Sequence, residues 1–187
     1  TMMEFPDFDV ADVYLNGQKL GRHIGGFTPF QFEVTGKLRA ERNSLVVRVN
    51  NQRHPEAVPT VNTDWWNYGG LTRDVSLREV PAVHVRDFTL RLQRGGAGLA
   101  TGWVQLEGAT AGERVSVRVP ELGVQREVRS DENGRVNFEL ALTGATWWTP
   151  ESPKLYEVEI ACRTDRITER IGFRTIETRG QDILLNG

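Results

Sequence analysis

The chain has 187 residues, of which 39% are hydrophobic and 26% are charged, so it can fold as a globular protein and bury a core. Its 23 basic and 25 acidic residues leave a formal net charge of -2, which argues against nucleic acid as a partner and against attraction to an anionic membrane. No apolar run reaches the roughly 20 residues of a membrane span, and a single cysteine, Cys162, excludes an internal disulfide framework.

Short strands are predicted along the whole chain, because apolar and polar residues alternate with a period of two. In chain order these strands lie at residues 13–15, 30–34, 45–49, 75–77, 83–85, 88–92, 103–106, 115–119, 136–140, 155–160 and 171–176. Turn clusters rich in Gly, Asn and Asp separate them. No capped amphipathic helix of ten residues is present in the sequence. The pattern therefore predicts an all-β fold.

A domain boundary is predicted near Pro81. After it, about seven strands fit into residues 82–178 with the turn spacing of an immunoglobulin-like sandwich. Residues 1–80 hold only about four or five strands, and the chain begins almost inside one. Residues 183–187 form an apolar strand that runs into an Asn-Gly turn with no second strand after it. We therefore expect a fragment of a longer protein. Residues 1–35 should then contain an unpaired sheet edge. We expect these residues either to be disordered or to associate with a second copy in a homo-oligomer.

The sequence holds no set of residues that could carry catalysis by itself. The histidines His23, His54 and His84 lie about thirty residues apart, without the spacing of metal ligands. No serine occupies a Gly-x-Ser-x-Gly elbow. Cys162 alternates with strand neighbours and is expected in the core or on a sheet face. We therefore predict no catalytic residue, no metal ligand and no cofactor in this chain.

One long loop is the best candidate for binding. About twenty residues without a strand pattern separate the predicted strands at 45–49 and 73–77, and loops of this length are usually functional or disordered. The loop contains Asp64, Trp65, Trp66, Asn67, Tyr68, Gly69 and Gly70. Aromatic faces stack on sugar rings, and carboxylate and amide groups bond sugar hydroxyls. The alternative is that the aromatic side chains anchor the loop to its own domain, and this alternative is favoured for Trp66 and Tyr68.

Five sequence blocks occur in an order that is typical of one family. They are VYLNGQKLG at 13–21, GGFTPFQFEV at 25–34, DWWNYGGLTRDV at 64–75, WTPESPKLY at 148–156, and IGFRTIE with ILLNG at 171–177 and 183–187. Together they resemble glycoside hydrolase family 2, which comprises β-galactosidases, β-glucuronidases, β-mannosidases and relatives. The resemblance is specific because the blocks are spread over nearly the whole chain.

The resemblance implies a fold, a domain order and a function. Residues 1–80 would be the C-terminal part of a jelly-roll, galactose-binding-like domain, and residues 82–178 an immunoglobulin-like β-sandwich. Residues 179–187 would lead into a (β/α)₈ catalytic barrel that the chain does not contain. The family's two catalytic glutamates lie in that barrel, so the chain alone would lack the carboxylate pair of retaining hydrolysis and be inactive. The complete protein would hydrolyse O-glycosyl bonds in carbohydrate metabolism. No signal peptide is visible in this segment, so cytoplasm and periplasm both stay open.

The resemblance also carries site residues across. Asp64 would reach into the active site of the barrel and touch a β-linked sugar substrate, and Trp65 would help to line the same mouth. The non-catalytic domains would pack on their own barrel. Two alternatives remain open, a self-standing carbohydrate-binding module and a spacer sandwich without a ligand.

Several further residues of these blocks are interpreted as structural. Arg73 and Asp74 would fix the exit of the loop. Trp147, Trp148 and Tyr156 would pack the end of the sandwich, and the Tyr156 hydroxyl is expected to bond backbone as a corner residue.

Overall fold

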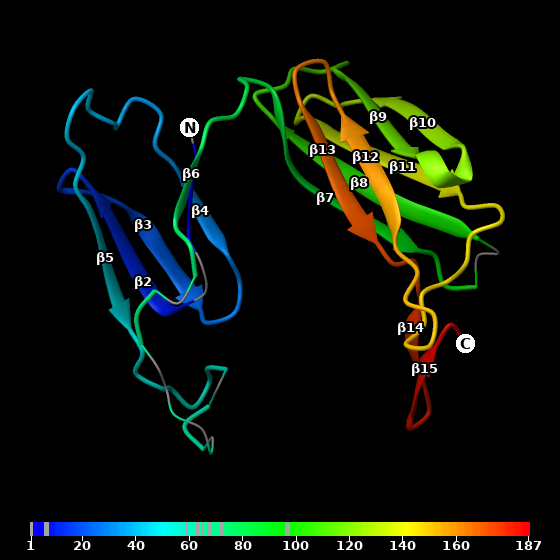
Figure 1. Cartoon of the computed structure of the whole chain (residues 1–187), viewed down its shortest axis with the longest axis horizontal. Helices are drawn as coiled ribbons and strands as arrows, with labels where there is room; N and C mark the ends of the chain where they lie inside the picture. The colour runs from blue at the N-terminus through cyan, green and yellow to red at the C-terminus, as the bar shows by residue number, and fades with distance from the viewer. Residues whose placement is uncertain are drawn as a thin grey trace. The chain divides into compact units, whose positions relative to one another are not determined.

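The computed structural model describes residues 2–5, 8–58, 60–62, 64, 66, 69–71, 73–95 and 98–187. Tertiary contacts divide the chain into two compact units, residues 1–80 and 81–187 (Figure 1). Within the described residues, every regular element is a β-strand except one 3-10 helix at Pro120–Leu122. The predicted all-β fold is therefore confirmed. None of the helical structure in these residues is long and apolar enough to cross a membrane.

The first unit consists of two three-stranded antiparallel sheets. Its strands are β1 (Met2–Phe5), β2 (Phe8–Leu15), β3 (Gln18–Gly25), β4 (Phe30–Glu33), β5 (Leu45–Asn50) and β6 (Ser76–Arg78). The sheet orders are β4-β1-β6 and β3-β2-β5. The predicted tight turn joins β2 to β3, with φ of 53° at Asn16 and 83° at Gly17, a conformation that this dipeptide adopts readily.

Asn16 also connects this turn to a distant segment. Its side-chain amide donates to the Lys37 carbonyl at 3.0 Å, and its side-chain oxygen accepts from the Ser44 backbone N–H at 3.0 Å. A backbone hydrogen bond from Asn16 to Ser44, 2.8 Å long, completes the connection. These contacts need both a donor and an acceptor on one side chain, which an amide supplies.

The core of the first unit lies between its two sheets. Val13, Leu15 and Val34 are buried, and Phe32 packs against them. A Cβ added at Gly21 would lie 2.3 Å from the Phe32 ring, so this position has no room for a side chain. The glycine that ends the block at residues 13–21 is therefore required by packing.

The two N-terminal strands do not form the expected open edge, but two outer strands, β3 and β4, do lie within residues 1–35. β1 lies between β4 and β6, and β2 lies between β3 and β5, so both N-terminal strands are central in their sheets. The expected self-association through residues 1–35 therefore cannot use β1 or β2 as an open edge. Among the described strands of this unit, the outer ones are β3, β4, β5 and β6. Self-association itself stays a prediction.

Among its described residues, the second unit has a sandwich of seven strands. They are β7 (His84–Leu92), β8 (Leu99–Glu107), β9 (Arg114–Val119), β10 (Val124–Arg129), β11 (Arg135–Ala141), β12 (Tyr156–Ala161) and β13 (Arg166–Ile171). The predicted strands at 83–85 and 88–92 are one strand here, and two of the seven strands, β10 and β13, were not predicted. They form a four-stranded sheet, β10-β9-β12-β13, and a three-stranded sheet, β11-β8-β7. Alternate residues of both sheets, such as Val104, Val117 and Val136, fill the core between them. Cys162 is partly buried against this core, which confirms its predicted position.

Tyr156 is the expected corner residue. Its ring is buried beside Phe173, with centroids 5.9 Å apart, and its hydroxyl accepts a 2.8 Å hydrogen bond from the Thr146 backbone N–H. The bond fastens the irregular segment before β12 to the start of that strand. The structural interpretation of Tyr156 is thus confirmed.

Removing this hydroxyl is expected to weaken the second unit. Tyr156→Phe keeps the ring in the core but deprives Thr146 N–H of its acceptor, which should lower the free energy of unfolding by about 1 kcal/mol. Urea denaturation followed by tryptophan fluorescence would measure the loss. Tyr14→Phe is the matched control, because no side-chain hydrogen bond of Tyr14 occurs among the described residues. Equal stability of the two variants would contradict the corner role.

The end of the chain also differs from our expectation. The predicted strand at 171–176 is instead the end of β13, an irregular segment, and the beginning of β14 (Ile176–Arg179). The last strand, β15 (Asp182–Leu185), pairs backward with β14 through a turn in which Gly180 has φ of 63°. The terminal strand therefore pairs with the strand before it, a hairpin that the sequence pattern did not predict.

Asn186 fastens this hairpin to the sandwich. Its side-chain oxygen accepts from the Thr175 N–H at 3.0 Å, and its amide donates to the Trp148 carbonyl at 3.1 Å. The Trp148 ring lies over Gly172, where an added Cβ would be 2.7 Å away. The structural interpretation of Trp148 is confirmed by these contacts.

Candidate functional site

The long loop begins after β5 and ends before β6. Its two ends lie close together, because a Cβ added at Gly69 would be 2.9 Å from the Asn51 side chain. Gly70 has φ of 95°, a conformation that glycine adopts without strain. No strand occurs in the described residues between β5 and β6, as the sequence pattern predicted.

Asp64 is exposed on this loop. Its carboxylate makes no hydrogen bond or ion pair with any other described residue, so a capping role has no support in the described part of the loop. Trp65, the second predicted site residue, lies outside the described residues, as do Asn67 and Tyr68. The substrate-contacting roles of Asp64 and Trp65 therefore stay predictions.

Trp66 does not anchor the loop. We expected its ring to pack against its own domain, but 82% of the residue is exposed. That expectation was wrong for Trp66. A large indole left in solvent beside an exposed carboxylate is more typical of a binding surface than of a packed loop.

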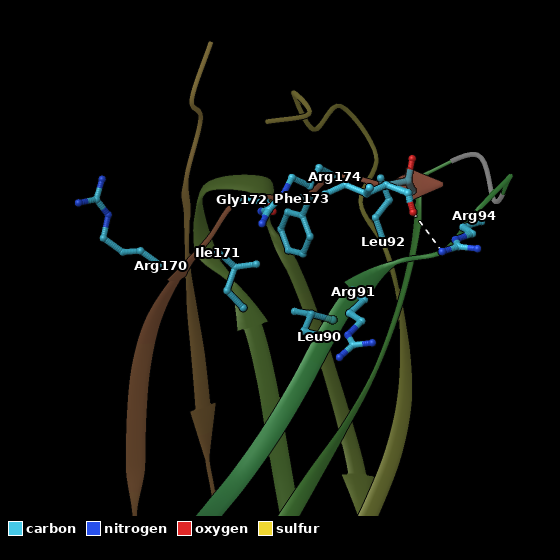
Figure 2. A pocket seen from close by; sticks show the side chains of 11 residues that line it. Leu90, Arg91, Leu92, Arg94, Arg170, Ile171, Gly172, Phe173 and Arg174 are labelled. Carbon is cyan, nitrogen blue, oxygen red and sulfur yellow. Dashed lines mark hydrogen bonds between the residues drawn. The ribbon is translucent and has the colours of Figure 1, made fainter. Parts of the chain in front are cut away.

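The second unit has a groove that sequence reasoning did not find. It lies between the end of β7 and the segment that follows β13, with a volume of about 600 Å³ (Figure 2). Apolar side chains gather at its centre: Leu90, Leu92, Ile171 and Phe173. Four arginines are among its lining residues: Arg91, Arg94, Arg170 and Arg174. About eighty residues separate the two sides of this groove, so local patterns could not reveal it.

Arg94 joins the two sides of the groove, whereas Arg174 makes its contacts on one side only. Arg94 donates to the Ile176 carbonyl at 3.1 Å, the dashed contact in Figure 2. Arg174 donates to the Gly172 carbonyl at 3.2 Å and lies over the Trp148 ring, 5.1 Å from its centroid. Figure 2 shows the Arg170 side chain directed away from the groove. Among the described residues that line it there is no carboxylate, thiol or imidazole.

A buried carboxylate lies in the first unit. Asp12, on β2, is 5% exposed and lies 2.7 Å from Lys19 Nζ and 3.4 Å from Arg22 Nε. The Lys19 ammonium, by its hydrogen bond and charge, and the Arg22 charge hold the pKa of Asp12 below its ordinary value of 3.8, although burial opposes them. Among the described residues, no three His, Cys, Asp or Glu side chains gather as a metal site requires.

The lowered pKa of Asp12 predicts a loss of stability in acid. A carboxyl with a depressed folded-state pKa stabilises the fold above its unfolded-state pKa, near 3.8, and this contribution is lost as the pH falls through the folded-state value. Asp12→Asn should therefore be less stable at pH 7, and its stability should fall less steeply than that of the unchanged protein below pH 4 or so. Melting temperatures across this range measure the effect. Glu41→Gln, at an exposed carboxylate without a described ion pair, is the control; parallel pH curves for Asp12→Asn and the unchanged protein would contradict the prediction.

Comparison with known families accounts for almost the whole chain. Residues 4–81 match the family described as "Glycosyl hydrolases family 2, sugar binding domain", and residues 83–174 match "Glycosyl hydrolases family 2". The chain belongs to glycosyl hydrolase family 2. The two matched regions are N-terminal, non-catalytic domains of the family, a jelly-roll-like sugar-binding domain and an immunoglobulin-like domain. The family's catalytic barrel is not part of this chain.

Individual relatives agree with this assignment. The chain is 33% identical to a β-galactosidase of Arthrobacter sp. and 29% identical to a β-galactosidase of Streptococcus thermophilus, over 94% of its length in each case. Among solved structures, the β-glucuronidase of Bifidobacterium dentium, complexed with coumarin-3-O-glucuronide, covers 100% of the chain with 27% identity and a TM-score of 0.81. The chain spans 17%, 18% and 38% of these three family 2 proteins, respectively.

Proposed function

We propose that this chain forms the non-catalytic N-terminal region of a β-galactosidase- or β-glucuronidase-like glycoside hydrolase. Residues 1–80 are the C-terminal part of its sugar-binding domain, residues 82–178 its immunoglobulin-like domain, and residues 179–187 the lead into the catalytic barrel. The family assignment supports this proposal, as does the small share of each relative that the chain spans. The complete protein would act on a β-linked sugar.

The finer proposal is that the loop after β5 reaches the substrate, with Asp64 and Trp65 at the mouth of the active site. The observation that carries it is the exposed Asp64 carboxylate, which has no partner among the described residues, next to a Trp66 that is 82% exposed. A carboxylate in this state can accept a charge-assisted hydrogen bond from a sugar hydroxyl. The neighbouring indole can cover apolar surface of the barrel or of the sugar.

The proposed packing on the barrel has support in each unit. In the first unit Ile24 and Phe27 are exposed, and in the β14–β15 hairpin Ile183 is 77% exposed. Large apolar side chains that are left in solvent favour a surface that another domain covers. We therefore propose that the hairpin and the loop side of the first unit contact the catalytic barrel.

The chain alone is expected to lack glycosidase activity. Retaining hydrolysis needs a carboxylic acid and a carboxylate about 5–5.5 Å apart, one to protonate the leaving oxygen and one to attack the anomeric carbon. In the proposed complete protein, both belong to the barrel. Nitrophenyl β-galactoside and β-glucuronide should therefore be stable with the pure 187-residue chain and hydrolysed by the complete protein. Turnover by the chain above a buffer blank would overturn the non-catalytic assignment.

A further inference from the structure

A second hollow lies on the outer face of the three-stranded sheet of the sandwich. It has a volume of about 580 Å³ and is centred on strands β7, β8 and β11. Its polar and aromatic lining includes Trp103, Thr89, Arg91, Arg126, Asn137 and Glu139. This face is opposite to the one that carries the core residues Val104 and Val136.

Strand register places the side chains of this sheet around one indole, and Arg126 joins the lining from β10 of the other sheet. Trp103 on β8 lies directly opposite Thr89 on β7 and Asn137 on β11. In the next outward-facing row, Thr101 lies between Arg91 and Glu139. Because alternate residues of a strand point to the same face, both rows project from the outer surface of the sheet. Trp103 is half-buried, whereas Arg91, Asn137 and Glu139 are exposed.

Arg135 orients the indole. Its guanidinium carbon is 3.6 Å from the centroid of the Trp103 ring. Arg135 lies opposite Gln105, in the row next to Trp103. The row with Arg91 and Glu139 lies on the other side of Trp103. Arg135 does not line the hollow. A cation therefore covers part of the indole, and the Trp103 side chain itself lines the hollow.

The polar and charged groups around the hollow are without partners in the described part of the chain. Among the described residues, the side chains of Arg91, Arg126, Asn137 and Glu139 make no hydrogen bond or ion pair. Elsewhere in the same unit arginines do pair with glutamates, as Arg86 does with Glu107 at 2.9 Å. The hollow thus combines an aromatic face with two guanidinium groups, an amide and one carboxylate, all available to a ligand.

We propose that this hollow is a second, non-catalytic binding site for an acidic saccharide. The ring of a uronic acid residue stacks on Trp103, since apolar C–H groups of sugars pack on aromatic faces. Its carboxylate binds Arg91 and Arg126, which present the planar donors that carboxylates prefer. Asn137 and Glu139 bond hydroxyls. Two cations against one carboxylate favour an anionic sugar over a neutral one.

Affinity electrophoresis of the complete protein tests this site. The gel contains polygalacturonate, a polyuronate, or the same polymer fully methyl-esterified, which keeps the sugar backbone but removes its charge. We expect retardation by polygalacturonate and little by the ester. Trp103→Ala and Arg91→Gln should each weaken retardation by about tenfold, the effect of one lost stacking or charged contact. Trp103→Phe keeps an aromatic face and should retain most binding. Arg114→Gln, on β9, removes an exposed arginine that does not line the hollow and should bind normally.

Kinetics on a nitrophenyl glycoside separate this site from the active site. A β-glycosidase does not cleave the α-linkages of polygalacturonate, so retardation by this polymer does not report on the active site. Trp103→Ala should leave kcat/KM for the nitrophenyl glycoside unchanged. Melting temperatures identify variants that have lost their fold. If Trp103→Ala is unfolded, the test of the aromatic contact rests on Trp103→Phe, which should still be retarded by polygalacturonate. Absence of retardation, equal retardation by the esterified polymer, or undiminished binding by both Trp103→Ala and Arg91→Gln would each overturn the proposal. None of these outcomes depends on the role of Asp64.

Discussion

Asp64→Asn in the complete protein is expected to lower kcat/KM by roughly ten- to hundred-and-fifty-fold. The proposed role of Asp64 is to accept a charge-assisted hydrogen bond from a sugar hydroxyl, and losing one charged partner typically costs about 1.5–3 kcal/mol. The amide is nearly the same size as the carboxylate, so the substitution changes charge and donor pattern without opening a cavity. Initial rates with a nitrophenyl glycoside, measured across substrate concentrations for Asp64→Asn and for the unchanged protein, give the ratio of the two kcat/KM values.

The control for this experiment is an exposed carboxylate of the first unit that lies outside the loop. Glu41 is exposed, and Glu41→Gln also removes one negative charge, so its kcat/KM should stay near that of the unchanged protein. Melting temperatures of both variants separate catalysis from folding. An unchanged kcat/KM for Asp64→Asn, or a loss that unfolding fully explains, would reduce Asp64 to a structural residue.

Phe173→Ala is expected to have the largest effect on stability. Phe173 is 1% exposed, packs beside Tyr156 and belongs to the core of the sandwich. Its carbonyl also accepts a 2.9 Å hydrogen bond from Trp148 N–H, so the residue joins the end of β13 to the segment before β12. Truncating a buried phenylalanine typically costs about 3–5 kcal/mol, because transfer free energy is lost and a cavity remains. That is a large part of the roughly 5–15 kcal/mol that stabilises a domain.

Chemical denaturation of the unchanged and substituted proteins measures this cost. Phe27→Ala is the matched control, because Phe27 is 63% exposed and its truncation leaves no cavity in the described core; its loss should stay within about 0.5 kcal/mol. Phe173→Leu should fall between the two. A loss below about 1 kcal/mol for Phe173→Ala would show that the sandwich can close the cavity by repacking.

Strand periodicity predicted most of the fold, and its failures have local causes. The strands of the second core, such as β9 and β11, alternate strictly, because one face is buried and the other is wet. β10 and β13 were missed because charged residues interrupt their apolar pattern, VQREVR and RITERI. Both are outer strands of their sheet, where fewer side chains must be buried. β3 was missed for a similar reason, although the Asn16-Gly17 turn before it was recognised.

The sequence by itself determined the all-β class, the Asn16-Gly17 turn and the backbone-bonding role of Tyr156, since each depends on residue chemistry or on spacing within a short segment. Only the tertiary structure decided that β15 pairs backward with β14, that Trp66 is exposed, and that Trp103 and Asn137 share a row with Thr89. The physical reason is that register between strands far apart in the chain is set by the packing of the whole core. A single strand's pattern shows which face is buried, but not which residues from other strands will stand beside it.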